Sequence, residues 1–299
     1  MSIGPFGKAG RFWRGNLHAH STRSDGRLNV EALCRVYRDG NYDFLAVTDH
    51  FLQEYGYPIT DATAFDGDGF ITIPGAELHA GSISTGEPWH LVGVGLPHDF
   101  APPAPGESGP ELAARALRAG AFVAAAHPAW YGATAADILS LGPIHAVEAW
   151  NATSDDYNDR ADSWTVLDQL LAEGGRHLAC VADDTHSSGT RSDALRAWVW
   201  VKSESLEADA IVHALKGGDY YSSMGPQIHE IDRDDRHLVV RCSPAERVFV
   251  TGKGSAATAV RGDDLIEARL DIGAVRSPYC RVTVRDRCGR RAWSNPIWL

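Results

Sequence analysis

Short apolar runs alternate with helix-like stretches from the N-terminus to about residue 223. Three of the stretches, residues 30–42, 111–120 and 208–218, carry apolar residues three and four positions apart and end near a glycine, as helices often do. Strands that alternate with helices in this way are typical of a parallel sheet with helices outside it. We therefore predict an α/β fold with these strands: FLAVT (44–48), ITIPG (71–75), HLVGVGL (90–96), FVAAAH (122–127), AVEAWN (146–151), HLACVA (177–182) and AWVWV (197–201).

The pattern changes after the turn-rich segment YSSMGPQ at residues 221–227. Beyond it the apolar runs HLVVRC, RVFVTG, LIEARLDI and YCRVTVRD are short and of β type, and Gly, Pro, Asp and Ser separate them. We predict an α/β barrel domain over residues 1–225 and a small all-β domain over residues 226–299. Residues 101–110, APPAPGESGP, are rich in Pro and Gly, so we expect them to form an exposed loop.

Composition indicates an ordinary globular protein. Of the 299 residues, 44% are hydrophobic and 22% are charged, which excludes the disordered and fibrous classes. The apolar runs fall short of the roughly 20 residues that a membrane helix needs, and the N-terminus lacks the features of a secretory signal. The five cysteines are scattered and form no CxxC pair. We therefore expect reduced thiols and a cytoplasmic protein that has no membrane partner.

The formal net charge of -11 argues against a nucleic-acid partner, because binding to the phosphate backbone depends on an excess of Lys and Arg. Bound divalent cations would reverse the charge locally, so an acidic protein could still attract an anionic small molecule. We expect a small-molecule substrate, and the oligomeric state stays open.

Histidine and carboxylate side chains recur at the ends of the predicted strands. His18 and His20 are two positions apart, so an extended segment would direct both imidazoles to one face. The carboxyl ends of parallel strands converge at one mouth of an α/β barrel, and buried ionisable groups are costly unless they are paired or bind a metal ion. The other members are Asp25, Asp49, His50, Glu77, His127, Glu148, Asn151, Asp183, Asp184 and His186. His90 begins its run, so it fits only if the preceding loop folds over the mouth.

Five motifs resemble those of the polymerase and histidinol phosphatase (PHP) family of metal-dependent phosphoesterases. They are HAHSTRSDG (18–26), TDH (48–50), the Glu of GAEL (75–78), the His of AAHP (125–128) and DTH (184–186). They occur in the family's order within roughly residues 12–223. SSMGP and the ending AWSNPIWL most resemble the branch related to the carbaryl hydrolases, which also carries a β tail. The resemblance implies a distorted barrel of seven βα units, a (βα)7 barrel, with two or three metal ions.

Carried over position by position, the resemblance implies nine metal ligands. His18, His20, Glu77 and Asp184 would hold one ion. Glu77 would bridge to a second ion held by His90 and His127. Asp25, His50 and His186 would hold a third ion, although some relatives have a histidine in place of Asp25. Mixed imidazole and carboxylate ligation suits Zn, Mn or Fe, and Asp49 could orient a ligand histidine from outside the set.

This ligand set predicts a hydrolase that uses metal-bound hydroxide at a di- or trinuclear site, because no Ser or Cys is placed as an evident nucleophile. His79, two residues after Glu77, is a candidate general acid; it could equally be a supporting or surface histidine. Trp130, Asn151 and Arg191 lie near the predicted mouth and could contact the substrate. Arg191 would supply the planar donor pair that suits phosphate, whereas Trp130 could instead fill the barrel rim.

Three functions compete. Hydrolysis of small-molecule phosphoesters comes first, and hydrolysis of a carbamate or carboxylic ester on the same metal site comes second. The third is a metal-binding or ligand-binding protein without turnover. We also expect the β tail to pack against the barrel without supplying a metal ligand, because His229, His237 and the acidic residues between them look like solvated turns.

Overall fold

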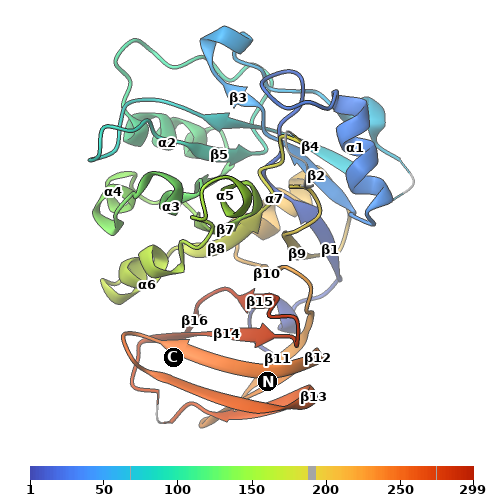
Figure 1. Ribbon diagram of the computed structural model, residues 1–299, viewed down its shortest axis with the longest axis vertical. Helices are drawn as coiled ribbons and strands as arrows, with labels where there is room; N and C mark the ends of the chain where they lie inside the picture. The colour runs from blue at the N-terminus through green and yellow to red at the C-terminus, as the bar shows by residue number, and fades with distance from the viewer. Residues whose placement is uncertain (68, 188–192, 274) are drawn as a thin grey trace.

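The computed structural model describes residues 1–67, 69–187, 193–273 and 275–299, and a large mixed sheet runs through it (Figure 1). Paired strands follow the order β11-β12-β14-β15-β10-β9-β1-β2-β4-β5-β6-β7-β8. Strands β13, β16 and β3 pair with β12, β14 and β4, respectively. The strands before the tail are β1 (Arg11–Asn16), β2 (Phe44–Val47), β3 (His50–Phe51), β4 (Ile71–Leu78), β5 (Leu91–Val94), β6 (Phe122–Ala125), β7 (Ala146–Asn151), β8 (Leu178–Ala182), β9 (Trp198–Ser203) and β10 (Tyr220–Ser223).

The seven apolar runs predicted as strands correspond to β2 and to β4 through β9, so the α/β fold class is confirmed. The three predicted helices are also present, as α1, α2 and α7. The helices are α1 (Val30–Asp39), α2 (Gly109–Arg118), α3 (Pro128–Tyr131), α4 (Ala135–Ser140), α5 (Ala152–Tyr157), α6 (Trp164–Ala172) and α7 (Ala208–Lys216), with short 3-10 turns η1 (Gly4–Gly7), η2 (Gln53–Tyr55) and η3 (Thr63–Phe65).

Local signals explain where these helices begin. The side chain of Asn29 accepts a hydrogen bond from the backbone N–H of Ala32 at the start of α1. Ser108 and Glu111 form a reciprocal capping box at the start of α2, directly after the Pro-rich loop. In Figure 1, α1 lies on one side of the sheet, and α2 to α6 lie together on another.

The expectation of uniformly parallel strands is wrong in part. β5 pairs antiparallel with both β4 and β6, and β9 pairs antiparallel with β1 and β10. Residues 79–90, which join β4 to β5, form no helix, and without a helical crossover the chain returns antiparallel. The ladder of paired strands does not close on itself, so the (βα)7 barrel is not confirmed. An isolated parallel bridge between Ala19 and Thr185 nevertheless joins the segments that follow β1 and β8.

The tail is built from β-strands, which gather at one end of the molecule in Figure 1. Two predicted runs, HLVVRC and RVFVTG, belong to a single long strand, β12. The tail has its own buried core, in which Leu238, Val248 and Val282 are fully buried. Its strands are β11 (Ile228–Arg233), β12 (His237–Gly252), β13 (Ala257–Asp271), β14 (Tyr279–Arg285), β15 (Arg291–Ser294) and β16 (Ile297–Trp298). Among the described residues, no helix combines the length and apolar character needed to cross a membrane.

Candidate metal centre

Segments that follow β1 and β8 bring the first two histidines beside the DTH motif. The backbone N–H of His20 donates to the Thr185 carbonyl over 2.9 Å, and that of Asp184 donates to the His18 carbonyl over the same distance. These two bonds flank the bridge between Ala19 and Thr185. Residues more than 160 positions apart in sequence are therefore held side by side by backbone contacts between the segments that follow β1 and β8.

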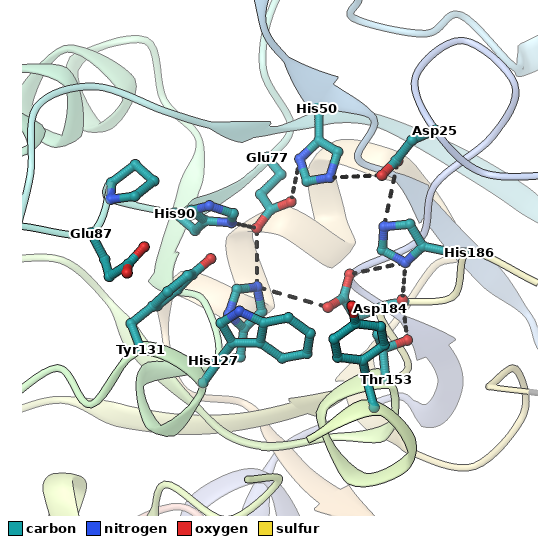
Figure 2. Close-up of a pocket in the computed structure, with 13 residues that line it drawn as sticks. Asp25, His50, Glu77, Glu87, His90, His127, Tyr131, Thr153, Asp184 and His186 are labelled. Carbon is teal, nitrogen blue, oxygen red and sulfur yellow. Dashed lines mark hydrogen bonds and ion pairs between the residues drawn. The ribbon is translucent and has the colours of Figure 1, made fainter. Parts of the chain in front are cut away.

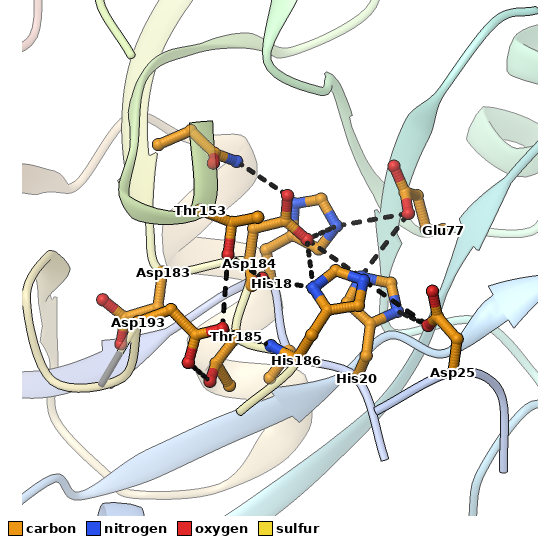
Figure 3. A network of polar contacts seen from close by, with 12 residues as sticks. His18, His20, Asp25, Glu77, Thr153, Asp183, Asp184, Thr185, His186 and Asp193 are labelled. Carbon is orange, nitrogen blue, oxygen red and sulfur yellow. Dashed lines mark hydrogen bonds and ion pairs between the residues drawn. The ribbon is translucent and has the colours of Figure 1, made fainter. Parts of the chain in front are cut away.

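The first cluster consists of His18, His20, Glu77 and Asp184, all of which are buried (Figure 3). Asp184 Oδ1 lies 3.1 Å from His18 Nε2 and 3.0 Å from His20 Nε2. Glu77 Oε2 lies 3.5 Å from each of the same two nitrogens. Four potential ligand atoms thus surround one point.

Glu77 divides its two carboxylate oxygens between neighbouring groups of histidines (Figure 2). Oε2 faces the first cluster and also lies 2.8 Å from His50 Nδ1. Oε1 lies 2.6 Å from His90 Nδ1 and 3.1 Å from His127 Nε2. The structure therefore brings His90 and His127 together on the side of Glu77 away from His18 and His20, an arrangement that suits a bridging carboxylate.

Asp25 forms the third group with His50 and His186. Its carboxylate oxygens lie 3.5 Å from His50 Nε2 and 3.4 Å from His186 Nε2. His20 also approaches, with Nδ1 3.8 Å from Asp25 Oδ1. Asp25 is exposed whereas the first cluster is buried, so the sites become more open to solvent from the first cluster toward the third.

These clusters fit divalent metal ions. Ligand atoms that share one ion at about 2.1 Å lie roughly 3.0–3.4 Å apart, close to the separations in the first cluster. His18 Nε2, Glu77 Oε2 and His20 Nδ1 are buried and have no hydrogen-bond partner within the described protein. A buried polar atom without a partner costs about 1–3 kcal/mol, so bound cations would satisfy atoms that the protein leaves unpaired.

Burial and neighbouring charges shift the pKa values of the cluster. Burial alone would raise the pKa of the Glu77 carboxyl, but His90, His50 and His18 hold it well below its usual range. Burial, with His186 and His50 nearby, lowers the pKa of His20 to about 4. Glu77 is therefore ionised and His20 is neutral near pH 7, and these are the forms that bind metal ions.

Two residues of the ligand set have unusual backbone conformations. His127 has a φ of 27° and Asp184 a φ of 55°, both in the region that disfavours residues with a Cβ. Such conformations cost about 1–3 kcal/mol each and cluster at functional sites, where the surrounding structure enforces them. Here they bring the two side chains close together, with His127 Nε2 3.7 Å from Asp184 Oδ2.

The Glu148 carboxylate contacts two of the candidate ligands, His18 and His127. Its Oε1 lies 3.1 Å from His18 Nδ1, and its Oε2 accepts from the backbone N–H of His127 over 2.8 Å. Asn151 donates to Glu148 Oε2 over 2.9 Å and to Asp184 Oδ2 over 3.1 Å. Our sequence analysis noted Glu148 at a strand end but gave it no role. A carboxylate that fixes the ring of a ligand histidine typically strengthens metal binding.

Replacing Glu148 by glutamine should weaken metal binding about 10- to 100-fold, because His18 loses the anionic partner that orients its ring. Competitive titration with a chromogenic chelator would measure the change. Asp137→Asn is the matched control: this carboxylate is also buried, but it caps α4 and bonds Ser84 far from the cluster. Equal metal affinity in the wild type and the Glu148→Gln variant would show that Glu148 has no such role.

The remaining predicted site residues lie in different places. His79 is buried with Nε2 2.9 Å from His50 Nδ1, and together with His50, Glu77 and His90 it forms a further group that could hold a metal ion. It also lines a second cavity, of about 580 Å³. Asn151 is fully buried, where it bonds Glu148 and Asp184. Arg191 lies outside the described residues. Asp49 accepts from Ser21, Ser24 and Thr60, so it orders the loop that carries Asp25, and within the described part of the chain its hydrogen bonds go to none of the histidines.

A cavity of about 480 Å³ opens over the second and third groups (Figure 2). Trp130 is part of its wall, as predicted for a residue near the mouth. Seven candidate ligands also line the cavity, but sequence reasoning did not single out five further members of the wall, which lie in loops and short helices that follow the strands. These additional lining residues are Glu87, Pro88, Tyr131, Thr153 and Tyr157.

The metal clusters found among the described residues draw only on positions between 18 and 186. In the tail, His237 instead lies 3.2 Å from Asp234 and 2.8 Å from an Arg269 nitrogen. Both of these neighbours are largely exposed. The tail thus places His237 in a surface network of charged side chains.

No family model matches the sequence, and no curated protein matches it. Solved structures resemble it in fold. A two-domain protein from Bacteroides vulgatus that contains a predicted PHP-like metal-dependent phosphoesterase has 12% identity and a TM-score of 0.51, covering 92% of this chain and 90% of its own. This similarity establishes a shared fold.

Two further structures are more distant. A proposed metal-dependent phosphoesterase from Bifidobacterium adolescentis has 14% identity and a TM-score of 0.42, covering 60% of this chain and 89% of its own. An amidohydrolase from Chromobacterium violaceum, with bound sulfate and no metal, has 16% identity and a TM-score of 0.45. The match covers 57% of this chain and 87% of the amidohydrolase. We draw no conclusion from similarities this weak.

Proposed function

We propose that this chain is a metal-dependent hydrolase of small phosphoesters, of the PHP kind. The observation that carries the proposal is the set of adjoining ligand clusters, joined by Glu77, on the wall of a cavity of about 480 Å³. The shared fold of the Bacteroides protein supports the family. Within it, the branch related to the carbaryl hydrolases rests on the sequence motifs SSMGP and AWSNPIWL.

Charge on the cavity wall supports a role for bound cations. Among the described lining residues, Asp25, Glu77, Glu87 and Asp184 are acidic and none is Lys or Arg. These four carboxylates place negative charge where a phosphoester would bind. Two or three divalent ions of Zn, Mn or Fe would offset these carboxylates, lower the pKa of a coordinated water to about 7 and stabilise negative charge on the substrate.

The residues of this chain would then position the reacting groups. The nine candidate ligands would hold the ions, and Glu148 and Asn151 would orient three of these ligands, His18, His127 and Asp184. Burial, with Glu77 and Asp184 nearby, raises the pKa of the Tyr131 phenol, so its hydroxyl stays protonated and can donate to a substrate oxygen. Hydrolysis of a phosphomonoester would consume one water and release an alcohol and inorganic phosphate.

A panel of esters tests the proposal. The protein, loaded in turn with Mn, Zn or Fe, would be assayed on a phosphomonoester, a phosphodiester, a carboxylic ester and a carbamate with the same chromogenic leaving group. We expect a phosphoester to be cleaved fastest. Metal binding without turnover of any member would favour a non-catalytic binding protein.

Hydrolysis of a carbamate or carboxylic ester is the second candidate. The observation that favours it is the acidic wall, because a neutral substrate needs no cationic side chain among the described residues. Faster cleavage of the neutral members of the panel than of either phosphoester would replace the first proposal by this one.

Inorganic phosphate should inhibit the metal-loaded enzyme competitively at millimolar concentration. The product anion has the same charged oxygens as the phosphoester substrate and would meet the same two or three cations. Initial rates at several phosphate concentrations should show a rise in KM with kcat unchanged. Sulfate and chloride at equal ionic strength serve as controls. Unchanged rates in 10 mM phosphate would count against a phosphoester substrate.

A further inference from the structure

Two aromatic side chains form a stacked pair on the cavity wall. The rings of Trp130, in α3, and Tyr157, at the end of α5, lie 5.2 Å apart at 26° to each other. Both line the cavity, and Tyr157 is 79% exposed. Large hydrophobic side chains with comparable exposure are few among the described residues, and this one stands at the mouth of a candidate active site.

The pair is anchored to the turns that carry the clusters. α3 begins directly after His127, and α5 begins directly after Asn151, whose side chain accepts from the Ser154 N–H. The Trp130 ring lies 6.0 Å from the His127 ring, and the Tyr131 ring lies 4.7 Å from the His90 ring. Aromatic side chains of the cavity wall therefore lie directly beside two candidate ligands, His90 and His127.

We infer that the substrate carries a planar aromatic ring close to the bond that is cleaved, and that Trp130 and Tyr157 bind this ring by stacking. The inference rests on the proposed ester hydrolysis for the position of the reacting group. Aromatic faces favour offset-stacked or edge-on contact with another ring over contact with an aliphatic group of equal size.

Benzyl phosphate and cyclohexylmethyl phosphate provide a matched test, because the two leaving groups are similar in size and basicity and only one is planar and aromatic. We expect kcat/KM to be higher for benzyl phosphate. Trp130→Leu and Tyr157→Leu should each lower the benzyl to cyclohexylmethyl ratio by about 3- to 10-fold, corresponding to the usual strength of aromatic pairing. Trp130→Phe, which keeps an aromatic face, should restore most of the ratio.

Ile266→Ala is the control variant. Ile266 is an exposed apolar residue of β13 in the tail, 64% exposed, and its replacement should leave the ratio unchanged. A ratio near one in the wild type, or a ratio that the Trp130 and Tyr157 variants do not change, overturns the inference.

Binding provides a readout that does not depend on turnover. Calorimetry of the metal-loaded protein with benzylphosphonate and with cyclohexylmethylphosphonate should show tighter binding of the aromatic member, by about 3- to 10-fold. If the protein binds benzylphosphonate more tightly but hydrolyses neither phosphate ester, the proposed function is wrong and the inference about the aromatic ring still holds. Failure to prefer benzylphosphonate overturns the inference, whatever happens to hydrolysis.

Discussion

Replacing Glu77 by glutamine should remove metal from at least two of the three clusters and lower hydrolysis by at least about 100-fold. The reason is the division of its carboxylate: Oε2 faces His18, His20 and His50, whereas Oε1 faces His90 and His127. A glutamine amide keeps the shape of the side chain but loses the negative charge and replaces one ligand oxygen by an NH2 group.

Elemental analysis after exhaustive dialysis would measure the loss in the Glu77→Gln variant, with steady-state rates on the best substrate. Glu87→Gln is the matched control, because Glu87 lines the same cavity but belongs to none of the clusters. We expect this control to retain its metal. Full metal content and activity in the Glu77→Gln protein would show that Glu77 does not bridge two sites.

Removing the metal ions from the wild-type protein should destabilise it, and more strongly at pH 9.5 than at pH 6.5. An ion present at 1,000 times its Kd stabilises the native state by about 4 kcal/mol, provided that it does not bind the unfolded chain. Without ions, nearby carboxylates hold protons on some of the cluster histidines, including His50 and His186. Burial alone would lower the pKa of His50, but Glu77 and Asp25 raise it to about 10, and Asp25 and Asp184 likewise raise that of His186 to about 9.

The sign of the pH effect follows from these shifts. A histidine whose pKa is raised on folding stabilises the metal-free protein fully below its unfolded pKa of about 6.5, and that contribution is lost as the pH rises through 9 to 10. Histidines that bind an ion are already deprotonated, so the metal-loaded protein does not lose stability in this way. The difference in Tm between loaded and metal-free protein should therefore widen with pH.

Thermal unfolding at pH 6.5, 8 and 9.5, with and without chelator, would measure this difference. In the Glu77→Gln variant the chelator should have little effect, which separates loss of bound metal from any direct action of the chelator. A Tm difference that is absent, or that narrows as the pH rises, would contradict the expectation.

Much of the fold and of the candidate site can be predicted from local pattern. Short apolar runs bounded by turns predict strands, and β7 begins and ends at the predicted residues, Ala146 and Asn151. The alternation of a strand likewise indicates that His18 and His20 share a direction. The motifs that contain the candidate ligands occur in the same order as in the PHP family. The nine candidate ligands can therefore be named from the sequence alone.

Local pattern does not determine which strand ends lie at the mouth. His90 precedes β5 and seemed misplaced, because a parallel strand would carry its first residue to the opposite end of the sheet. Since β5 is antiparallel to β4 and β6, its first residue lies beside the last residues of its neighbours, and Ala126 N–H donates to the His90 carbonyl over 3.1 Å. The reversal of one strand is what brings His90 to Glu77.

The supporting residues also depend on tertiary structure. Glu148 and Asn151 lie at the end of β7 in sequence, yet their partners, His18 and Asp184, come from segments that follow β1 and β8. The stacked pair of Trp130 and Tyr157 joins two helices that follow different strands. Sequence alone determined the elements and the types of chemical group, because hydrophobic periodicity and ligand chemistry are local properties. The tertiary structure decided which of those groups meet, because strand direction and long-range pairing depend on contacts between residues far apart in the chain.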